Sequence, residues 1–301
     1  MKRPRTLRQR ARWPVATVAS LLLTIVTGCG GGVAAPPPHR LNVVTTNFPL
    51  AQLVANVGGN RVTVTDLSKG AADDRAVDPS PAQVAELRHA ALVVEVGDGY
   101  QSRVEAAAGA GPGVLALLPR LGGVRPGHSA EFWLDPTAMR AATGIVAGAL
   151  RGADPAGAQA YANGDEDFTA VLSTLDIDFQ NTLSDCPNKV VFTPDDALAG
   201  LATRYQLRLD VLAANATPGA VARAATLVRD RSLTTVFSEP PVTDPALAAL
   251  AGDTHTKLLA LDTMDGAAPP PEPSGYSYFN RMEGDLARLS TGLRCVSTNE
   301  P

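Results

Sequence analysis

Two adjacent carboxylates, Asp195 and Asp196, follow directly on the apolar stretch VVFT and precede a segment with helical spacing. Carboxylate oxygens at such a junction are suitable ligands for manganese, magnesium or calcium. Acids also stabilise the start of a helix, where they meet the positive end of its dipole, and Thr193 with Pro194 would suit a helix N-terminus. No histidine lies near these acids, so a ligand role and a capping role both remain open.

Strand-like and helix-like patterns alternate along the chain on both sides of these acids. In the first half, the strand candidates are 41–46, 61–67 and 91–97, and the helix candidates are 48–58 and 81–90. In the second half, the strand candidates are 189–193, 208–214, 234–239 and 257–262, and the helix candidates are 196–205, 218–231 and 245–253. Apolar strands that alternate with helices indicate a parallel sheet covered on both faces. We therefore expect an α/β fold of two lobes, each with a mainly parallel sheet flanked by helices.

Residues 135–183 separate the two sets and carry a helical pattern. Asp154 and Pro155 restart the helix as its N-cap and first residue. Beyond them, apolar side chains recur at helical steps: Tyr161, Phe168, Leu172, Leu175, Phe179 and Leu183. We expect a long helical strut between the lobes, which would restrict domain closure and leave ligand capture to local loop movements.

In open α/β sheets, ligands bind beyond the carboxyl ends of the strands. Four predicted loops meet this condition: 70–81, 125–136, 193–197 and 262–266. Each contains at least one acid, so we expect the ligand site where these loops meet.

The first residues differ from the rest of the chain. Residues 1–12 carry six basic side chains and no acid, and the apolar run 13–26 that follows is too short to span a bilayer. The run ends in Val26-Thr27-Gly28-Cys29, which resembles the lipobox of bacterial lipoproteins. We expect residues 1–28 to be a lipoprotein signal peptide and Cys29 to be lipidated; the alternative is a plain secretory signal with an incidental cysteine. Residues 29–40 would then form a tether to the outer face of the cell membrane.

The charge of the mature chain excludes one class of partner. Without residues 1–28, 20 basic residues face 30 acids, so the expected body is acidic and unsuited to nucleic acid.

Two cysteines remain, Cys186 and Cys295, and in an oxidising compartment a pair without CxxC spacing is more often a disulfide than a metal site. The sequence contains no GxSxG, HExxH or P-loop motif, and we expect no enzyme.

Several segments resemble the zinc/manganese-type solute-binding proteins of bacterial ABC importers, over nearly all of residues 41–293. They are LNVVTTNFPLAQLVANVGGNRVTVTDL, VDPSPAQVAELRHAALVVEVGDGYQSRV, FWLDPTAMR and DDALAGLATRYQL. The resemblance implies a monomeric receptor that is anchored through Cys29 and delivers a divalent metal, manganese or zinc, to an ABC permease and its ATPase. It also implies an N-terminal α/β lobe (41–134), a linking helix (135–184) and a C-terminal α/β lobe (185–301).

In that family the metal lies between the lobes, held by three histidines, the third often replaced by Glu in manganese-type members, and a carboxylate. The resemblance places Arg75 at the first histidine position, Glu131 at the second, Asp195 at the third and Asp262 at the carboxylate. All three histidines are therefore changed. His128 is the one histidine near a ligand loop, although a histidine in such a loop is more often merely exposed.

Two functions follow from this ligand set. Glu131, Asp195 and Asp262 form an all-oxygen site suited to manganese, magnesium or calcium. Alternatively, Arg75, a permanent cation that only donates hydrogen bonds, pairs with two of these acids in the place of the metal. The chain would then be an accessory or interaction lipoprotein, or one that binds an anionic ligand. Further oxygen ligands are offered by Asp74, Asp78 and Glu239, for which a solvated or capping role is the commoner one.

Overall fold

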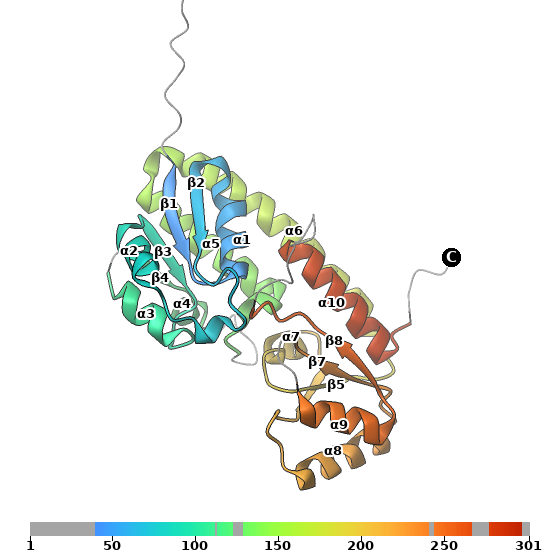
Figure 1. Ribbon diagram of the computed structural model, residues 1–301. Helices are drawn as coiled ribbons and strands as arrows, with labels where there is room; N and C mark the ends of the chain where they lie inside the picture. Colours follow the sequence, from blue (N-terminus) through green and yellow to red (C-terminus); the bar gives the residue numbers. More distant parts are fainter. Residues whose placement is uncertain (1–39, 112, 123–128, 241–243, 267–276, 297–301) are drawn as a thin grey trace, which may run out of the picture. The chain divides into compact units, whose positions relative to one another are not determined.

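The computed structural model describes residues 40–111, 113–122, 129–240, 244–266 and 277–296 (Figure 1). The predicted signal peptide, the lipidation site Cys29, all but the last residue of the tether and His128 lie outside these ranges.

The N-terminal lobe is built on one four-stranded parallel sheet with the order β2-β1-β3-β4. Its strands are β1 (Leu41–Thr45), β2 (Val62–Asp66), β3 (Leu92–Glu95) and β4 (Val114–Ala116). Its helices are α1 (Phe48–Gly58), α2 (Pro81–His89), α3 (Ser102–Ala108) and α4 (Leu118–Leu121), with short 3-10 turns η1 (Gly59–Arg61), η2 (Asp74–Ala76) and η5 (Phe132–Leu134). The predicted strands and helices of this half are thus present, and β4, α3 and α4 are additions that the sequence patterns did not indicate.

Local signals explain where the first helices begin. The Asn47 side chain accepts a hydrogen bond from Leu50 N (3.2 Å) and so caps α1. Ser80 and Gln83 form a reciprocal capping box at the start of α2, with Pro81 as the first helical residue. These caps fix the ends of the loops that follow β1 and β2.

The helical segment between the lobes is not a single rod. It divides into α5 (Pro136–Ala153) and α6 (Ala158–Ser184), joined through the turn η6 (Pro155–Gly157). Asp154 leaves the helical conformation (φ −136°, ψ 83°) and pairs with Arg61 Nη2 at 2.8 Å. Helix α6 then returns along α5, as Figure 1 shows, and the two helices pack side by side. Only α6 therefore corresponds to the expected strut, whereas α5 covers the N-terminal lobe, where it packs on α1.

Helix α6 buries the predicted apolar stripe. All six side chains of the stripe are buried: Tyr161, Phe168, Leu172, Leu175, Phe179 and Leu183. The stripe belongs to a single apolar core that also includes side chains of α1, α5 and α10 (Tyr278–Leu293). A shared core of this kind restricts movement of the lobes relative to α6.

The C-terminal lobe contains two parallel strand pairs. Strand β5 (Val190–Thr193) pairs with β6 (Arg208–Val211), and β7 (Thr235–Ser238) pairs with β8 (Lys257–Ala260). Strands β5 and β7 lie next to each other without forming one continuous hydrogen-bonded sheet. The helices of this lobe are α7 (Ala199–Arg204), α8 (Pro218–Asp230) and α9 (Pro245–Thr254).

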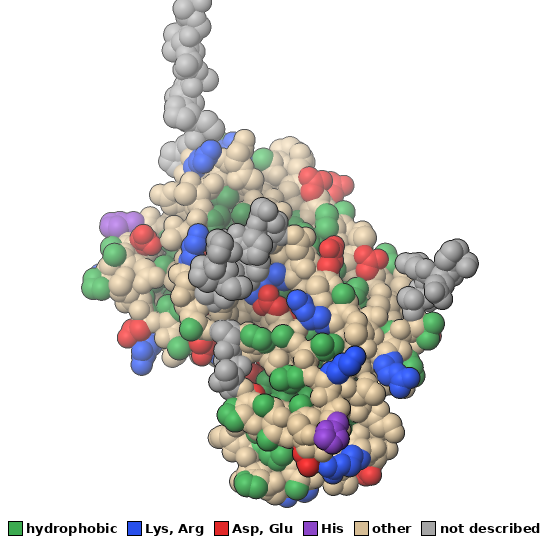
Figure 2. Space-filling model, turned by 45° about the vertical axis from the view of Figure 1, so that its right-hand side comes forward, with side chains coloured by type: hydrophobic (Ala, Val, Ile, Leu, Met, Phe, Trp, Pro, Cys, Tyr) green, Lys and Arg blue, Asp and Glu red, His purple; other side chains and the backbone are tan. Residues whose placement is uncertain are grey.

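Two contacts fasten the C-terminal lobe to the long helix. Phe179 of α6 stacks on Tyr205 with ring centroids 5.2 Å apart. Cys186, just after α6, forms a disulfide with Cys295, just after α10, as the sequence led us to expect. None of the described helices is long and apolar enough to cross a bilayer. On the face shown in Figure 2, basic and acidic side chains are interspersed.

Candidate functional site

A cavity of about 260 Å³ lies where loops from both lobes meet. Its lining residues are Ala72, Asp73, Arg75, Pro194, Asp195, Ala214, Glu239, Pro240, Thr263 and Asp265. The loops that contribute them follow β2, β5, β6, β7 and β8, so the cavity lies beyond the carboxyl ends of parallel strands. Three of the four loops that we expected to form the site contribute to it.

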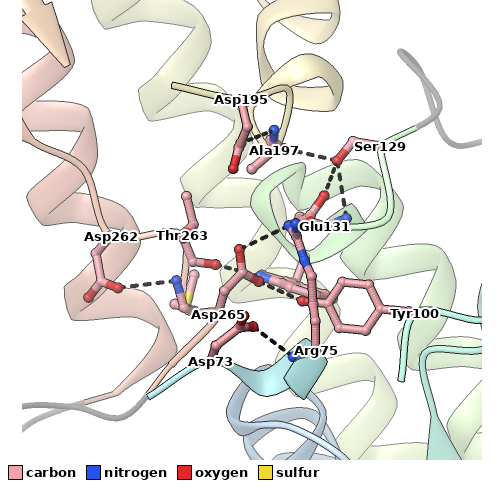
Figure 3. A network of polar contacts seen from close by, with 12 residues as sticks. Asp73, Arg75, Tyr100, Ser129, Glu131, Asp195, Ala197, Asp262, Thr263 and Asp265 are labelled. Atoms are coloured by element: carbon pink, nitrogen blue, oxygen red, sulfur yellow. Dashed lines mark hydrogen bonds and ion pairs between the residues drawn. The ribbon is translucent and has the colours of Figure 1, made fainter. Parts of the chain in front are cut away.

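Arg75 reaches into this cavity from the turn η2 and pairs with two acids (Figure 3). Its Nη2 atom contacts Glu131 Oε1 and lies 3.5 Å from Asp265 Oδ2. The guanidinium carbon also lies 5.4 Å from the centre of the Tyr100 ring, in cation–π range. Burial lowers the pKa of Arg75, but the charges of Glu131 and Asp265 outweigh this effect and hold the pKa above its usual value.

The two acids that hold Arg75 are themselves fixed by neighbouring groups. The Glu131 carboxylate contacts the Ser129 hydroxyl, which also donates to the Ala197 carbonyl at 3.0 Å. The Tyr100 hydroxyl donates to Asp265 Oδ1 at 2.7 Å. Burial, followed by the charge of Glu131, raises the pKa of Asp265. These contacts link Ser129 and Glu131, just before η5, with Ala197 in the turn after β5, and they link Tyr100 with Asp265 in the segment after β8.

Asp195 lies at the same cavity, and its side chain also shapes the turn after β5. Its Oδ1 atom accepts a hydrogen bond from Ala197 N at 2.8 Å, while the Thr193 hydroxyl donates to the Asp195 carbonyl at 2.8 Å. Helix α7 begins only at Ala199, so Thr193 is not its N-cap, and Asp196 is exposed. The structure therefore gives Asp195 a turn-forming role at the cavity, where its carboxylate also interacts with Glu239.

Glu239 lines the cavity directly after β7 and is the most unusual acid in it. The residue is 6% exposed, and its Oε1 atom has no hydrogen-bond partner. Burial, followed by the charge and hydrogen bonding of Asp195, raises the pKa of Glu239 to about 9. At neutral pH this side chain therefore carries a proton that a bound cation could replace.

Asp262 is not part of this cavity. Both of its carboxylate oxygens contact the guanidinium of Arg281 on α10, and its backbone N donates to Asp285 Oδ1 at 3.0 Å. Arg281 is 7% exposed and needs an acid, because an unpaired buried cation is costly. Asp265, three residues later, reaches the cavity where the sequence predicted Asp262.

Within the described ranges, no group of three or more His, Cys, Asp or Glu side chains has a geometry that could hold a metal ion. The two described histidines, His89 at the end of α2 and His255 after α9, do not line the cavity. In the described arrangement Arg75 is the cation that neutralises Glu131 and Asp265. A metal would bind there only after the side chains rearrange.

Comparison with known proteins identifies the family. The family model described as "ZnuA: Zinc-uptake complex component A periplasmic" matches residues 43–292. The chain belongs to this family. A relative with the same family name is the "High-affinity zinc uptake system protein ZnuA" of Bacillus subtilis, 20% identical over 94% of this chain and 98% of that protein. Another is the "Metal ABC transporter substrate-binding lipoprotein ScbA" of Streptococcus cristatus, 22% identical over 84% of this chain and 89% of that protein.

Solved structures agree with the ZnuA-type fold. The lipoprotein YcdH of Bacillus subtilis superposes with a TM-score of 0.75 at 19% identity, over 84% of this chain and 99% of that one. The zinc-binding protein TroA of Treponema pallidum gives a TM-score of 0.75 at 17% identity, over the same shares. At these identities the likeness concerns the two-lobed α/β fold and its long helix.

Several cavity residues were not among the site residues inferred from the sequence. Asp265 lies in the predicted loop 262–266, but the sequence gives no reason to prefer it to Asp262. Tyr100 carries no motif and is recognisable only by its position under the Arg75 guanidinium. Glu239 was noted as a possible extra ligand, and its position directly after a strand was the available signal.

Proposed function

We propose that this chain is the extracytoplasmic solute-binding lipoprotein of an ABC-type importer of divalent metal ions, with the cargo held in the cavity described above. One observation carries the proposal: acids from three separate loops, Asp195, Glu239 and Asp265, line a single cavity together with Arg75, which pairs with Asp265 and with the neighbouring Glu131. Such an excess of carboxylates favours a further positive charge. Membership of the zinc-uptake family supports the same conclusion.

The donor set indicates which metal the cavity would take. Carboxylate oxygens with water suit manganese, magnesium or calcium better than zinc, which takes imidazole and thiolate ligands readily. Glu131 and Asp195 are the ligands expected from the sequence, and Asp265 takes the place of Asp262. We therefore propose an oxygen-ligated ion, in contrast to the zinc named for several relatives.

The expected partners follow from this role. A permease and its ATPase would receive the cargo, and lipidation at Cys29 would hold the receptor at the outer face of the cell membrane. Relatives named as metal ABC transporter lipoproteins support this arrangement.

A second function is favoured by the contacts of Arg75. Its guanidinium already pairs with Glu131 and Asp265, and a filled cavity of this kind fits an accessory lipoprotein that no longer carries metal. The two functions differ in whether the purified protein takes up metal.

Metal titration of the mature protein separates them. Protein without its signal peptide is stripped with chelator, its metal content is measured by elemental analysis, and manganese, zinc and iron are titrated by calorimetry. Import predicts at least one ion bound more tightly than about 100 μM, equivalent to about 5.5 kcal/mol. Arg103→Gln, which changes an exposed arginine paired with Asp78, serves as the control and should match the parent. Absence of any binding at this level would rule out metal receptor function and leave the accessory role.

A further inference from the structure

The surroundings of Arg75 have the composition of a ligand site. A guanidinium group binds best between carboxylates that accept its N–H groups and against the face of an aromatic ring. Glu131, Asp265 and Tyr100 supply these three elements around one point. The Glu131 side chain is 4% exposed, while the Arg75 side chain is 42% exposed. The groups that receive the guanidinium, Glu131, Asp265 and Tyr100, are thus largely in the protein interior, whereas Arg75 extends into the pocket from the surface.

The receiving groups are also held without the help of Arg75. Ser129 contacts the Glu131 carboxylate, and Tyr100 donates to Asp265. Trp133 Nε1 donates to the Thr263 carbonyl at 2.9 Å and so fixes the segment that carries Asp265. Removal of the Arg75 side chain would therefore leave a formed anionic pocket rather than a collapsed one.

The Arg75 side chain can leave this pocket without any change in its backbone. The turn η2 is anchored beside it, because Asp74 N donates to the Asp265 carbonyl at 2.7 Å and Gln101 Nε2 donates to the Asp74 carbonyl at 2.8 Å. Rotation about the side-chain bonds of Arg75 is sufficient to move the guanidinium towards solvent, and such rotations are fast for exposed side chains.

We infer that this pocket is a guanidinium-binding site that the chain fills with its own Arg75, so that a cationic cargo must displace a tethered internal occupant. Because the guanidinium is covalently attached beside the pocket, its local concentration there is on the order of millimolar or more. The affinity for a cargo is then reduced in proportion to the fraction of time for which the pocket is free. The inference rests on the proposed function only in naming a metal ion as the cargo that competes.

Chemical complementation tests the pocket directly. The variant Arg75→Ala is titrated with methylguanidinium chloride, and binding is followed by calorimetry and by the melting temperature. We expect saturable binding and a rise in melting temperature for Arg75→Ala, and no response for the parent or for Arg103→Ala. The double variant Arg75→Ala/Asp265→Asn should lose the response. If Arg75→Ala does not fold, Arg75→Gln, which retains more side-chain packing, takes its place.

Two results would overturn the guanidinium site. One is an absence of response in every folded Arg75 variant, and the other is an equal response to tetramethylammonium chloride at the same ionic strength, which would indicate a non-specific cation effect.

In a separate arm, manganese and zinc should bind Arg75→Ala at least about tenfold more tightly than the parent, and methylguanidinium should weaken that binding. Equal metal affinity in parent and variant would overturn the competition. A saturable methylguanidinium response in a protein that binds no metal would support the pocket and refute the proposed metal import.

Discussion

Asp262 and Asp265 stand three residues apart and have separate partners: Asp262 pairs with Arg281 of α10, and Asp265 accepts a hydrogen bond from Tyr100 and lies 3.5 Å from Arg75. Met264, between them, adopts a left-handed conformation with φ of 63°. This turn directs one acid towards α10 and the other into the cavity (Figure 3).

The different partners of these two acids predict different effects of the same substitution. Asp265→Asn should weaken manganese binding about tenfold or more, because it removes a charged ligand from the cavity. Asp262→Asn should leave metal affinity unchanged and lower the free energy of unfolding by about 1–3 kcal/mol, because buried Arg281 loses its charged partner. Calorimetric titration and urea unfolding of both variants measure the two effects. A loss of affinity in Asp262→Asn alone would restore Asp262 as the ligand.

Asp135 predicts how stability changes with pH. It caps α5 by accepting a hydrogen bond from Thr137 N (2.8 Å), and burial raises its pKa to about 6. The folded state therefore holds this proton more firmly than the unfolded chain, so ionisation of Asp135 lowers the free energy of unfolding as the pH rises from about 4 to about 6. Asp135→Asn keeps the cap and cannot ionise. We expect it to be more stable than the parent above pH 6, by on the order of 2–3 kcal/mol, with no advantage below pH 4.

Urea unfolding of the parent and of Asp135→Asn at a series of pH values measures this difference. Asp78→Asn is a suitable control, because Asp78 is exposed and its pair with Arg103 contributes little. A constant difference between Asp135→Asn and the parent at all pH values would contradict the predicted ionisation.

The disulfide between Cys186 and Cys295 predicts a stability that depends on oxidation. The two cysteines are 109 residues apart in the sequence, so the bond closes a long loop in the unfolded chain. The double variant Cys186→Ser/Cys295→Ser should be about 2–5 kcal/mol less stable than the oxidised parent. Addition of a reductant should lower the melting temperature of the parent but not that of the double variant. Equal melting of the parent with and without reductant would mean that the bond does not contribute to stability.

Close packing of α6 against α1 predicts opposite effects of the same substitution at two glycines. A Cβ atom at Gly164 would lie 2.3 Å from the Val57 carbonyl oxygen, which forces the two helices apart. Gly164→Ala should therefore destabilise the protein by about 1–3 kcal/mol, although alanine favours the helix. In α5, a Cβ atom at Gly144 would meet no atom within 4 Å, and Gly144→Ala should stabilise by about 0.5–1 kcal/mol. Thermal unfolding of the two variants tests the pair, and a stabilised Gly164→Ala would show that the helices separate at no cost.

Most strands and helices, and the α/β class, were predictable from local sequence patterns, whereas β4, α3 and α4 were not. The pair Asp154-Pro155 marks the break before α6, and the apolar spacing from Tyr161 to Leu183 gives the buried face of that helix. These signals are local, because a cap or a stripe depends on residues a few positions apart. For the same reason the alternating pattern was sufficient to predict two α/β lobes.

Which side chains contact one another, by contrast, follows from the tertiary structure. The sequence around Asp262 does not indicate that Asp262 pairs with Arg281 or that Asp265 accepts a hydrogen bond from Tyr100. Both partners lie in distant segments of the chain. The fold of α5 back along α6 depends likewise on the pairing of Asp154 with Arg61, which lies 93 residues earlier. Polar contacts of this kind depend on distance and burial in the folded chain, so residue spacing predicts a site's location but not its final set of partners.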